Sequence, residues 1–432
     1  MAIRSSSAAA AALACAAAAL VCGGAAAARV TISNVVPRVD EDGDVISGGG
    51  GGMTYDATTA RYYYWSNFYQ PCGVEGLATC YCGGNGTFQD ECGACIVPGK
   101  VAAPRCCGWR NMTFACYSSA DLVSWRKEGM NILPVMTDAD SPYSSQQQAF
   151  FEPFGIFNRL TGWWVLWFLH PFAAGVAVSR SPGGPFEIVS WDADPSPQAT
   201  DFELYANATT DVVLFKHNSL TNASNGSVLG SQTVAVLADN YLALNGSSAP
   251  FAQAQGKTEG GGLFTRGGSA YAMSGTGCCF CPKGSNGFVY RSDGGALGAY
   301  AFLGDVIPRD GNGTAVTHAQ QRSVTPIYTT AGVTHMFTGT NVGSALDGQK
   351  CHDLQYWAPL EFDADGRVLN MSWVSSFTLD LAPPPPPPPL PPRPDDYYLC
   401  SLTAPGTCIP VPAGAPGAQP TAGECLQQCP AA

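Results

Sequence analysis

The chain has 432 residues, of which 46% are hydrophobic and only 12% are charged. A chain of this length and composition can bury a large core, so we expect a globular protein and not a disordered one. The formal net charge of -12 argues against nucleic acid and anionic membrane surfaces as partners, because phosphate contacts need clustered Lys and Arg side chains. A neutral partner fits the composition better.

Residues 1–28 have the composition of a secretory signal. A single Arg precedes an alanine-rich apolar stretch that ends in small residues, and this pattern predicts cleavage near Ala28. No later run of about 18 apolar residues could span a bilayer. We therefore expect a secreted, extracellular protein, which could reside in the cell wall.

Cysteines and glycosylation sequons agree with export. Sixteen of the 18 cysteines follow the expected cleavage site, and an even number in an oxidising compartment predicts disulfides. Eight Asn-x-Ser/Thr sequons indicate the same route. The cysteines between Cys72 and Cys116 match no standard zinc-finger spacing, so disulfides are expected there and no metal site. The sequence requires no cofactor.

Five times along the chain, an apolar strand leads through a short polar turn into a second strand of aromatic or β-branched residues. The five pairs span 53–65, 156–167, 204–215, 263–273 and 327–337. The last four begin about 48 to 64 residues apart, which suits four short strands per unit. The longer first step contains a cysteine-rich insertion, at about 72–107. This pattern predicts an all-β, five-bladed β-propeller, because a β-sandwich does not explain five evenly spaced units.

The expected propeller spans residues 29–381. Residues 382–395 are proline-rich and predict a polyproline II linker. Residues 396–432 contain four cysteines and predict a small disulfide-stapled module, or a fragment of one. This tail could bind carbohydrate, or it could be a module without a function of its own at the end of the proline-rich linker. We expect a monomer.

One polar or backbone-exposing position precedes each strand pair. The positions are the glycine run 48–52, Glu152, Asp201, Glu259 and Gln320. The first strand of each propeller blade lines the central channel, so these positions are expected to face one cavity. Carboxyl groups in one cleft perturb one another's pKa, which can supply a protonated acid for glycosidic cleavage. Any one of them alone could be an ordinary loop acid; the case for a shared site is their recurrence.

Several segments, in order along the chain, resemble a known family. They are residues 39–43 with the following glycine run, 117–125, 152–158, 164–170, 175–186 and 201–204, then Glu259, Gln320 and 356–360. Over about residues 31–381 the chain resembles the five-bladed propeller glycoside hydrolases of family 43, and within it the exo-β-1,3-galactanase group. The resemblance implies a secreted enzyme that acts on β-1,3-galactan or arabinogalactan-type polysaccharide.

The resemblance also implies roles for the polar positions. Family members of this kind hydrolyse with inversion, so one acid protonates the leaving oxygen while another group activates water on the opposite face. Glu259 matches the general acid, and Asp201 matches the acid that tunes its neighbour. Glu152 matches a carboxylate that contacts substrate or orients water. Gln320 stands where a base would act; a neutral amide is a poor base, so we expect it to position the water, unless a one-residue shift gives this role to Gln321.

Two positions in the first unit depart from the family. Gly49 stands where the family usually has His, and Asn67 stands where it usually has an acid. The loss of a sugar contact is the expected result, although the glycine run could let backbone approach a ligand closely. The cluster Cys278–Cys281 falls in an expected substrate-side loop and predicts reshaped subsites.

Aromatic side chains are further candidates for sugar binding, because apolar faces of pyranose rings stack on them. The candidates for substrate contact are Trp167, His170, Tyr356, Trp357 and Asn67. Packing between blades is the alternative for each ring.

Three functions remain open from the sequence. The first is an exo-acting β-1,3-galactosidase. The second is another family 43 activity, such as an arabinofuranosidase or xylosidase. The third is a catalytically silent carbohydrate-binding propeller, which the two departures and Gln320 suggest.

Overall fold

The computed structural model describes residues 28–69, 112–145, 150–170, 173–194, 199–206, 213–222, 228–252, 258–276, 283–345, 352–384, 386, 389, 398–400 and 408–410. The expected signal up to residue 27, the cysteine-rich insertion and the Cys278–Cys281 cluster lie outside these residues. So do most of the expected linker and tail.

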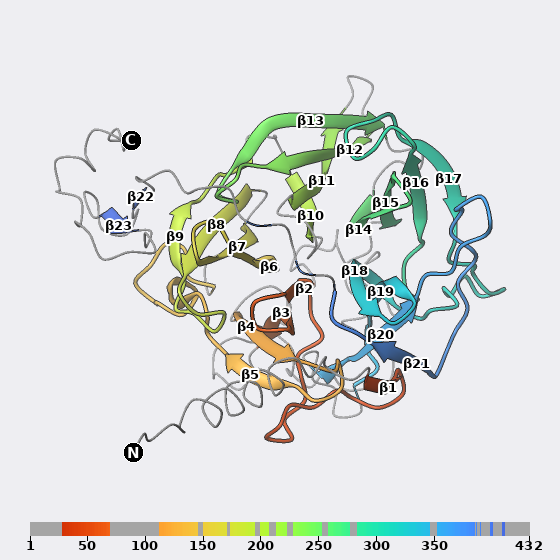
Figure 1. Cartoon of the computed structure of the whole chain (residues 1–432), viewed down its shortest axis with the longest axis horizontal. Helices are drawn as coiled ribbons and strands as arrows, with labels where there is room; N and C mark the ends of the chain where they lie inside the picture. Colours follow the sequence, from red (N-terminus) through yellow and green to blue (C-terminus); the bar gives the residue numbers. More distant parts are fainter. Residues whose placement is uncertain are drawn as a thin grey trace, which may run out of the picture.

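The described chain is a five-bladed β-propeller, which confirms the predicted fold class (Figure 1). Blade 1 contains β2 (Met53–Asp56), β3 (Arg61–Tyr69), β4 (Met112–Ser119) and β5 (Arg126–Gly129). Blade 2 contains β6 (Phe151–Asn158), β7 (Trp163–His170), β8 (Ala173–Ser179) and β9 (Glu187–Ser190). Blade 3 contains β10 (Ala199–Ala206), β11 (Val213–Asn222), β12 (Val228–Leu237) and β13 (Leu244–Ala252).

Blade 4 contains β14 (Thr258–Arg266), β15 (Ser269–Thr276), β16 (Phe288–Ser292) and β17 (Ala301–Asp305). Blade 5 contains β18 (Gln320–Thr329), β19 (Gly332–Asn341) and β20 (Leu354–Pro359). Its sheet continues from β18 into β21 (Ser376–Leu381) and β1 (Ala28–Ser33), so the first and last strands of the ring pair with each other. A separate two-stranded sheet joins β22 (Tyr398–Cys400) and β23 (Cys408–Pro410), and one short 3-10 helix, η1, spans Pro134–Met136.

The five strand pairs expected from the sequence are the two innermost strands of the five blades. Polar side chains close the turns between them. In blade 1 the Asp56 carboxylate accepts hydrogen bonds from the backbone of Thr58 and Thr59. In blade 2 the Asn158 side chain accepts one from the Thr161 backbone at 2.8 Å. Asp and Asn favour such turns because their short side chains bond the backbone two or three residues later.

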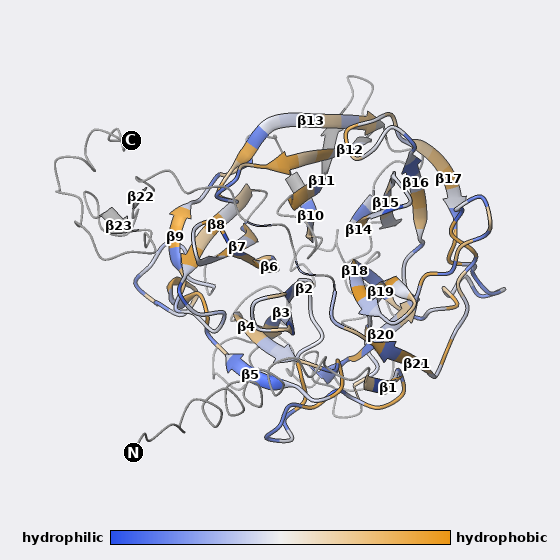
Figure 2. Ribbon diagram, viewed as in Figure 1, coloured by the Kyte–Doolittle hydropathy of each residue, from blue (hydrophilic) through white to orange (hydrophobic). Residues whose placement is uncertain are grey.

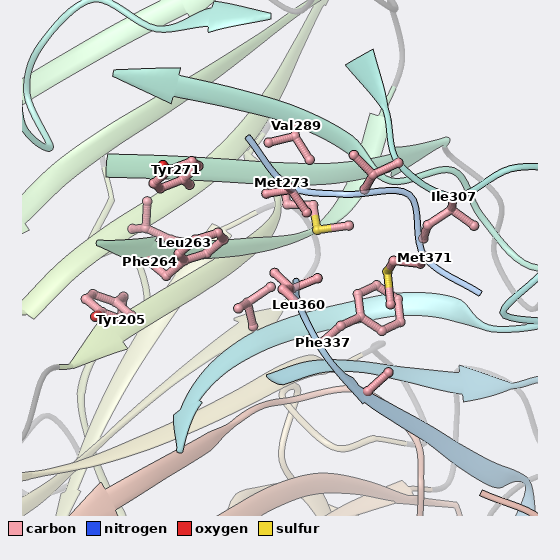
Figure 3. Packing of buried hydrophobic residues seen from close by; sticks show 14 of the residues in the cluster. Tyr205, Leu263, Phe264, Tyr271, Met273, Val289, Ile307, Phe337, Leu360 and Met371 are labelled. Atoms are coloured by element: carbon pink, nitrogen blue, oxygen red, sulfur yellow. The ribbon is translucent and has the colours of Figure 1, made fainter. Parts of the chain in front are cut away.

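The hydrophobic core lies between neighbouring blades, where the sheets pack face to face. Every residue of β7 is buried, which explains why its sequence is a continuous apolar run and not an alternating one. Figure 3 shows one cluster where strands of blades 4 and 5 meet, with Leu263, Met273 and Phe337 fully buried. Burying each such side chain contributes about 1.5–3 kcal/mol relative to leaving it exposed.

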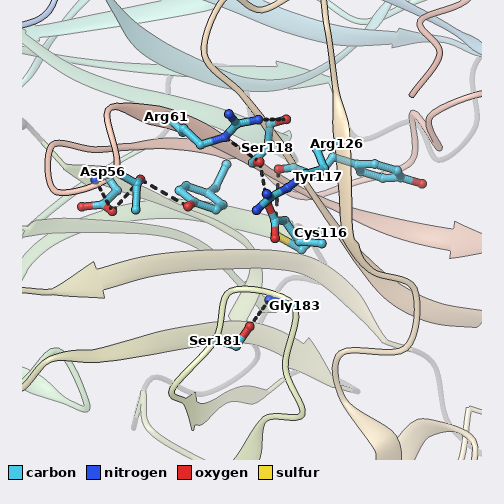
Figure 4. Close-up of polar contacts among 11 residues, drawn as sticks. Asp56, Arg61, Cys116, Tyr117, Ser118, Arg126, Ser181 and Gly183 are labelled. Carbon is cyan, nitrogen blue, oxygen red and sulfur yellow. Dashed lines mark hydrogen bonds and ion pairs between the residues drawn. The ribbon is translucent and has the colours of Figure 1, made fainter. Parts of the chain in front are cut away.

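Polar side chains cover the outer edge of blade 1. The outermost strand, β5, is hydrophilic (Figure 2) and has the sequence Arg-Lys-Glu-Gly. Figure 4 shows Arg61 donating from Nε to the Ser118 hydroxyl at 2.9 Å, and the Arg126 guanidinium pairs with Glu128 at 2.6 Å. Charged outer strands of this kind oppose edge-to-edge association of sheets.

Cys116 is an exception to the expectation that the cysteines of the first group form disulfides. It is a free thiol in β4, fully buried in the core between blades 1 and 2 beside Phe114 and Trp164. Burial raises the pKa of this thiol well above its usual value, which favours the thiol over the nucleophilic thiolate. The other cysteines of that group lie outside the described residues.

Candidate active site

Four polar positions expected from the sequence lie at the beginning of the innermost strands of four consecutive blades. Glu152 is in β6, Asp201 in β10, Glu259 in β14 and Gln320 in β18. These strands lie nearest the centre of the ring of blades (Figure 1). Because innermost strands of a propeller run in the same direction, their first residues gather at one end of the channel.

The sequence placed these positions just ahead of the strands, whereas the structure places them inside the strands. The reason is an irregularity that repeats in blades 2 to 5. The pairing register shifts between Phe151 and Phe154, between Ala199 and Phe202, between Glu259 and Gly262, and between Gln321 and Ser323. A β-bulge inserts an extra residue and re-aims a side chain, and bulges are common beside active sites.

Glu152 is fixed by residues from two other blades. One carboxylate oxygen, Oε2, accepts a hydrogen bond from the Gly51 backbone at 3.1 Å, and the other, Oε1, lies 3.3 Å from the Arg322 guanidinium. Arg322 is the residue at the bulge of β18 and also donates to the Thr340 hydroxyl at 3.4 Å. Glu152 itself has a positive φ of 49° and is 7% exposed. Blades 1, 2 and 5 therefore meet at this carboxylate.

The electrostatic environment of Glu152 shows that three carboxyl groups lie near one another. Burial, together with the negative charges of Asp201 and Glu259, raises the pKa of Glu152 to about 7, against the opposing effects of Arg322 and the Gly51 N–H. Desolvation and like charges both favour the protonated form of a carboxyl group. The arrangement can therefore hold a proton near neutral pH.

Asp201 holds the backbone immediately after Glu259. Its Oδ2 accepts a hydrogen bond of 2.6 Å from the Gly260 N–H. Gly260 has a φ of +61°, and a Cβ there would lie 2.8 Å from the Gln321 carbonyl oxygen, so only glycine fits. The bulge in β14 and the direction of the Glu259 side chain thus depend on a carboxylate from blade 3.

Two glutamines begin β18. Gln320 pairs with Thr340 and is 8% exposed, while Gln321 pairs with Gly339 and is 1% exposed. The Gln321 backbone N–H donates to the Ser285 hydroxyl at 2.8 Å, which draws it toward blade 4. Gln320 is the more accessible of the two and stays the candidate for positioning water.

The glycine run of blade 1 is packed tightly against its neighbours. Gly49 accepts a hydrogen bond of 2.6 Å from the Asn67 N–H, so the two positions that depart from the family pair with each other. A Cβ at Gly50 would lie 2.5 Å from the Asn67 side-chain amide, and one at Gly52 would overlap the Phe154 ring. In this structure, the close backbone approach that these glycines permit is to neighbouring strands.

Comparison with known proteins finds likeness in structure alone. No protein-family model matches the chain, and no curated protein sequence matches it. A β-1,3-galactosidase of glycoside hydrolase family 43 superposes with a TM-score of 0.56 at 16% identity, over 81% of this chain and 64% of its own. An exo-β-1,3-galactanase from Clostridium thermocellum superposes with a TM-score of 0.54 at 17% identity, over 81% of this chain and 67% of its own. The exo-β-1,3-galactanase of Phanerochaete chrysosporium, with β-1,3-galactotriose, superposes with a TM-score of 0.53 at 15% identity, over 79% of this chain and 66% of its own.

This chain has the fold of the family 43 exo-β-1,3-galactanases. The resemblance stated from its motifs is therefore confirmed at the level of the fold. The chain spans less than two thirds of the β-1,3-galactosidase and of the Phanerochaete galactanase. At these identities the activity has to be argued from the site.

Trp167 and His170, two of the expected sugar contacts, are interior packing residues in this galactanase-like fold. The Trp167 ring has no exposed surface, donates from Nε1 to the Tyr241 carbonyl at 2.8 Å and packs against Phe215. The His170 ring bonds the Trp191 carbonyl at 2.5 Å, and burial lowers its pKa. Neither ring presents a free face on which a pyranose could stack.

Tyr356 and Trp357 are also buried, each 1% exposed. The Tyr356 hydroxyl donates to the Ser372 carbonyl at 2.7 Å. The Trp357 ring is covered by the Arg38 guanidinium, which lies 3.7 Å from the ring centroid. In this structure all four side chains pack between strands or blades, and a contact of any of them with sugar stays a prediction.

Three charged residues around the site were not singled out from the sequence. Arg322, Glu203 and Lys216 are charged yet largely or fully buried in the two inner strands of their blades. A charge in such a strand is a recognisable signal, because buried charges persist only where they are paired or hydrogen-bonded.

Among the residues that the structure describes, no cluster of His, Cys, Asp and Glu could hold a metal ion, and no helix is long and apolar enough to cross a membrane.

Proposed function

We propose that this protein is a secreted, exo-acting glycoside hydrolase of family 43 that releases galactose from β-1,3-galactan or arabinogalactan-type polysaccharide with inversion. The observation that supports it most strongly is the burial of Glu152 within the field of Asp201 and Glu259, at the end of a channel in a fold shared with exo-β-1,3-galactanases. The partner is a neutral glycan, in keeping with the net charge of -12.

Each polar position has a distinct role in this proposal. Glu259, which is partly exposed, donates the proton to the leaving glycosidic oxygen. Asp201 holds the adjoining Gly260 peptide and is the acid that tunes its neighbour in this proposal. Glu152, fixed by Gly51 and Arg322, contacts substrate or orients water, and Gln320 positions the attacking water.

The second candidate is a carbohydrate-binding propeller without activity. The pairing of Gly49 with Asn67 favours it, because the first blade then contributes an amide and bare backbone where the family usually has His and an acid. Another family 43 activity, such as arabinofuranosidase or xylosidase, would use the same acids with different pocket contacts.

The test is product analysis on β-1,3-galactan with NMR of the first anomer released. Inversion of a β-linkage yields α-galactose first. Substitution of the acid, Glu259→Gln, is expected to lower kcat by about 10²- to 10⁴-fold, because an amide cannot donate the proton. The matched control is Glu187→Gln, an exposed residue on the outer strand β9, which should retain full activity.

The alternatives give different results. Binding of galactan with no sugar released after long incubation would favour the silent propeller. Release from aryl arabinofuranosides or xylosides, with none from galactan, would favour another family 43 activity. β-Galactose as the first product would contradict the assigned geometry.

A further inference from the structure

A buried glutamate and a buried lysine contact the strand segments that carry Glu259 and Gln320. Glu203 on β10 and Lys216 on β11 are cross-strand neighbours, and they are 2% and 0% exposed. Placing two charges in the interior carries a large desolvation cost. Neither residue has a part in the roles proposed above.

Lys216 contacts the bulge that follows the proposed acid. Its Nζ donates to the Gly260 carbonyl at 3.4 Å, and a Cβ at Gly261 would lie only 2.5 Å from this Nζ. The N–H of the same Gly260 donates to Asp201. Two side chains of blade 3, one anionic and one cationic, therefore hold both polar groups of the residue next to Glu259.

Glu203 extends this contact to the next blade. Its Oε1 accepts a hydrogen bond of 3.3 Å from the Val324 N–H in β18, just beyond the bulge that contains Arg322. The charged pair of blade 3 is thus bonded to the irregular segments of blades 4 and 5. The Glu259 and Gln320 side chains are carried by those two segments.

The charges of this pair are coupled to the site. Burial lowers the pKa of Lys216 to about 8, while Glu203 and Asp201 both oppose that shift. Burial raises the pKa of Glu203 well above its usual value; Lys216 opposes this, and the charge of Glu152 adds to it. The charged groups near Lys216 are thus Asp201 and Glu203, with Glu152 beyond them.

We propose that Lys216, supported by Glu203, is a positioning residue that holds the Gly260 carbonyl and so keeps the Glu259 carboxyl aimed at the glycosidic oxygen. Lys216 acts through the backbone and does not touch substrate. The proposal rests on the proposed function, and it assigns to blade 3 a role in aligning the acid of blade 4.

The test variant is Lys216→Met, which keeps the length of the side chain and removes its charge and its hydrogen-bond donor. We expect kcat on β-1,3-galactan to fall by about 10- to 100-fold with KM little changed, because a misplaced catalytic group costs about this much. The acidic limb of the kcat/KM profile should move to higher pH, because the loss of a cation disfavours the ionised form of the nearby carboxyl groups.

A second variant separates positioning from stability. Lys216→Met leaves Glu203 buried without its counter-charge, so Tm should fall; adding Glu203→Gln should recover Tm but not kcat. A merely structural role predicts that both recover together. The matched control is Arg38→Met, which removes another cation, whose guanidinium lies on the Trp357 ring and donates to the Gln355 and Ser33 carbonyls. It should lower Tm and leave the pH profile unchanged.

The proposal is overturned if Lys216→Met leaves both kcat and the pH profile unchanged. Failure of the proposed function is distinguishable, because the wild type itself would then release no galactose. In that case, hydrogen exchange at the Gly260 amide still tests whether Lys216 positions this peptide. We expect at least about 10-fold faster exchange in Lys216→Met, since the peptide held between Lys216 and Asp201 is loosened, and an unchanged rate would refute the positioning role.

Discussion

Glu152 shows how a single residue joins three blades. It belongs to blade 2, yet its carboxylate is held by Gly51 of blade 1 and by Arg322 of blade 5. Burial and two neighbouring carboxyl groups raise its pKa to about 7 from an ordinary value of 4.5. The native protein therefore binds a proton more tightly at this residue than the unfolded chain does.

This difference makes stability depend on pH. The contribution of Glu152 to the free energy of unfolding is fully present below pH 4.5 and is lost as the pH rises through about 7. We expect a loss of about 3 kcal/mol over that range, which Glu152→Gln should remove. Denaturant unfolding at pH 4.5 and 7.5 measures this loss in the free energy of unfolding. The control is Glu41→Gln, which changes an exposed glutamate. Equal pH dependence in the Glu152→Gln variant and the wild type would refute this account.

At the same scale, the polar residues were more predictable than the aromatic ones. Glu152, Asp201 and Glu259 could be singled out because each recurs at one place in a repeated unit. A Trp in a strand carries no comparable signal, since a ring between blades and a ring facing the channel have the same neighbours in sequence. Trp167 and Trp357 were therefore expected at the sugar and are found in the core.

Among structural elements, the bulged inner strand is the unit from which the site is built. The alternating sequence pattern of a strand does not show where one extra residue is inserted. The register shifts could therefore not be predicted from the sequence in three of the four blades. In β14 the run of glycines after Glu259 was the single hint. The glycine run before β2 also contributes to this site, because the Gly51 N–H donates a hydrogen bond to the Glu152 carboxylate.

Gly51 tests this element. Its φ is +73°, and a Cβ there would lie 2.3 Å from the Trp65 carbonyl oxygen and 2.6 Å from that of Pro153. Gly51→Ala should cost about 1–3 kcal/mol of stability and displace the donor to Glu152, lowering activity. The matched control is Gly43→Ala, which has a φ of +89° but no atom within 4 Å, so it isolates the backbone strain. Thermal unfolding and galactan assays of both variants measure the difference, and equal effects would refute the role of crowding.

For the whole molecule, the ring closes between strands that are far apart in sequence. β1 pairs with β21 along its full length, and Asn34 directly follows β1. The Asn34 side chain donates to the Trp357 and Val374 carbonyls at 2.7 and 3.0 Å and accepts from the Trp357 N–H at 2.9 Å. The spacing of the repeats predicted five blades, but no local pattern marks which distant strands pair to close them.

Asn34→Ala removes three of the bonds that close the ring. We expect a loss of about 3 kcal/mol in the free energy of unfolding, at roughly 1 kcal/mol for each bond. The control is Thr31→Ala, whose exposed hydroxyl bonds Thr378 at 3.2 Å and should contribute less than about 0.5 kcal/mol. Urea unfolding compares the two, and a similar small loss in both would show that Asn34 does not hold the ring closed.

The pairing of β1 with β21 has a consequence for how the site depends on chain order. Because the two ends of the ring are hydrogen-bonded neighbours, the order of blades around the channel determines which side chains meet, and the point where the polypeptide is interrupted does not. A circularly permuted chain, opened between any two blades and joined across β1 and β21, would bring Glu152, Asp201, Glu259 and Gln320 to the same end of the channel. The arrangement of these four side chains therefore follows from the order of the blades around the closed ring.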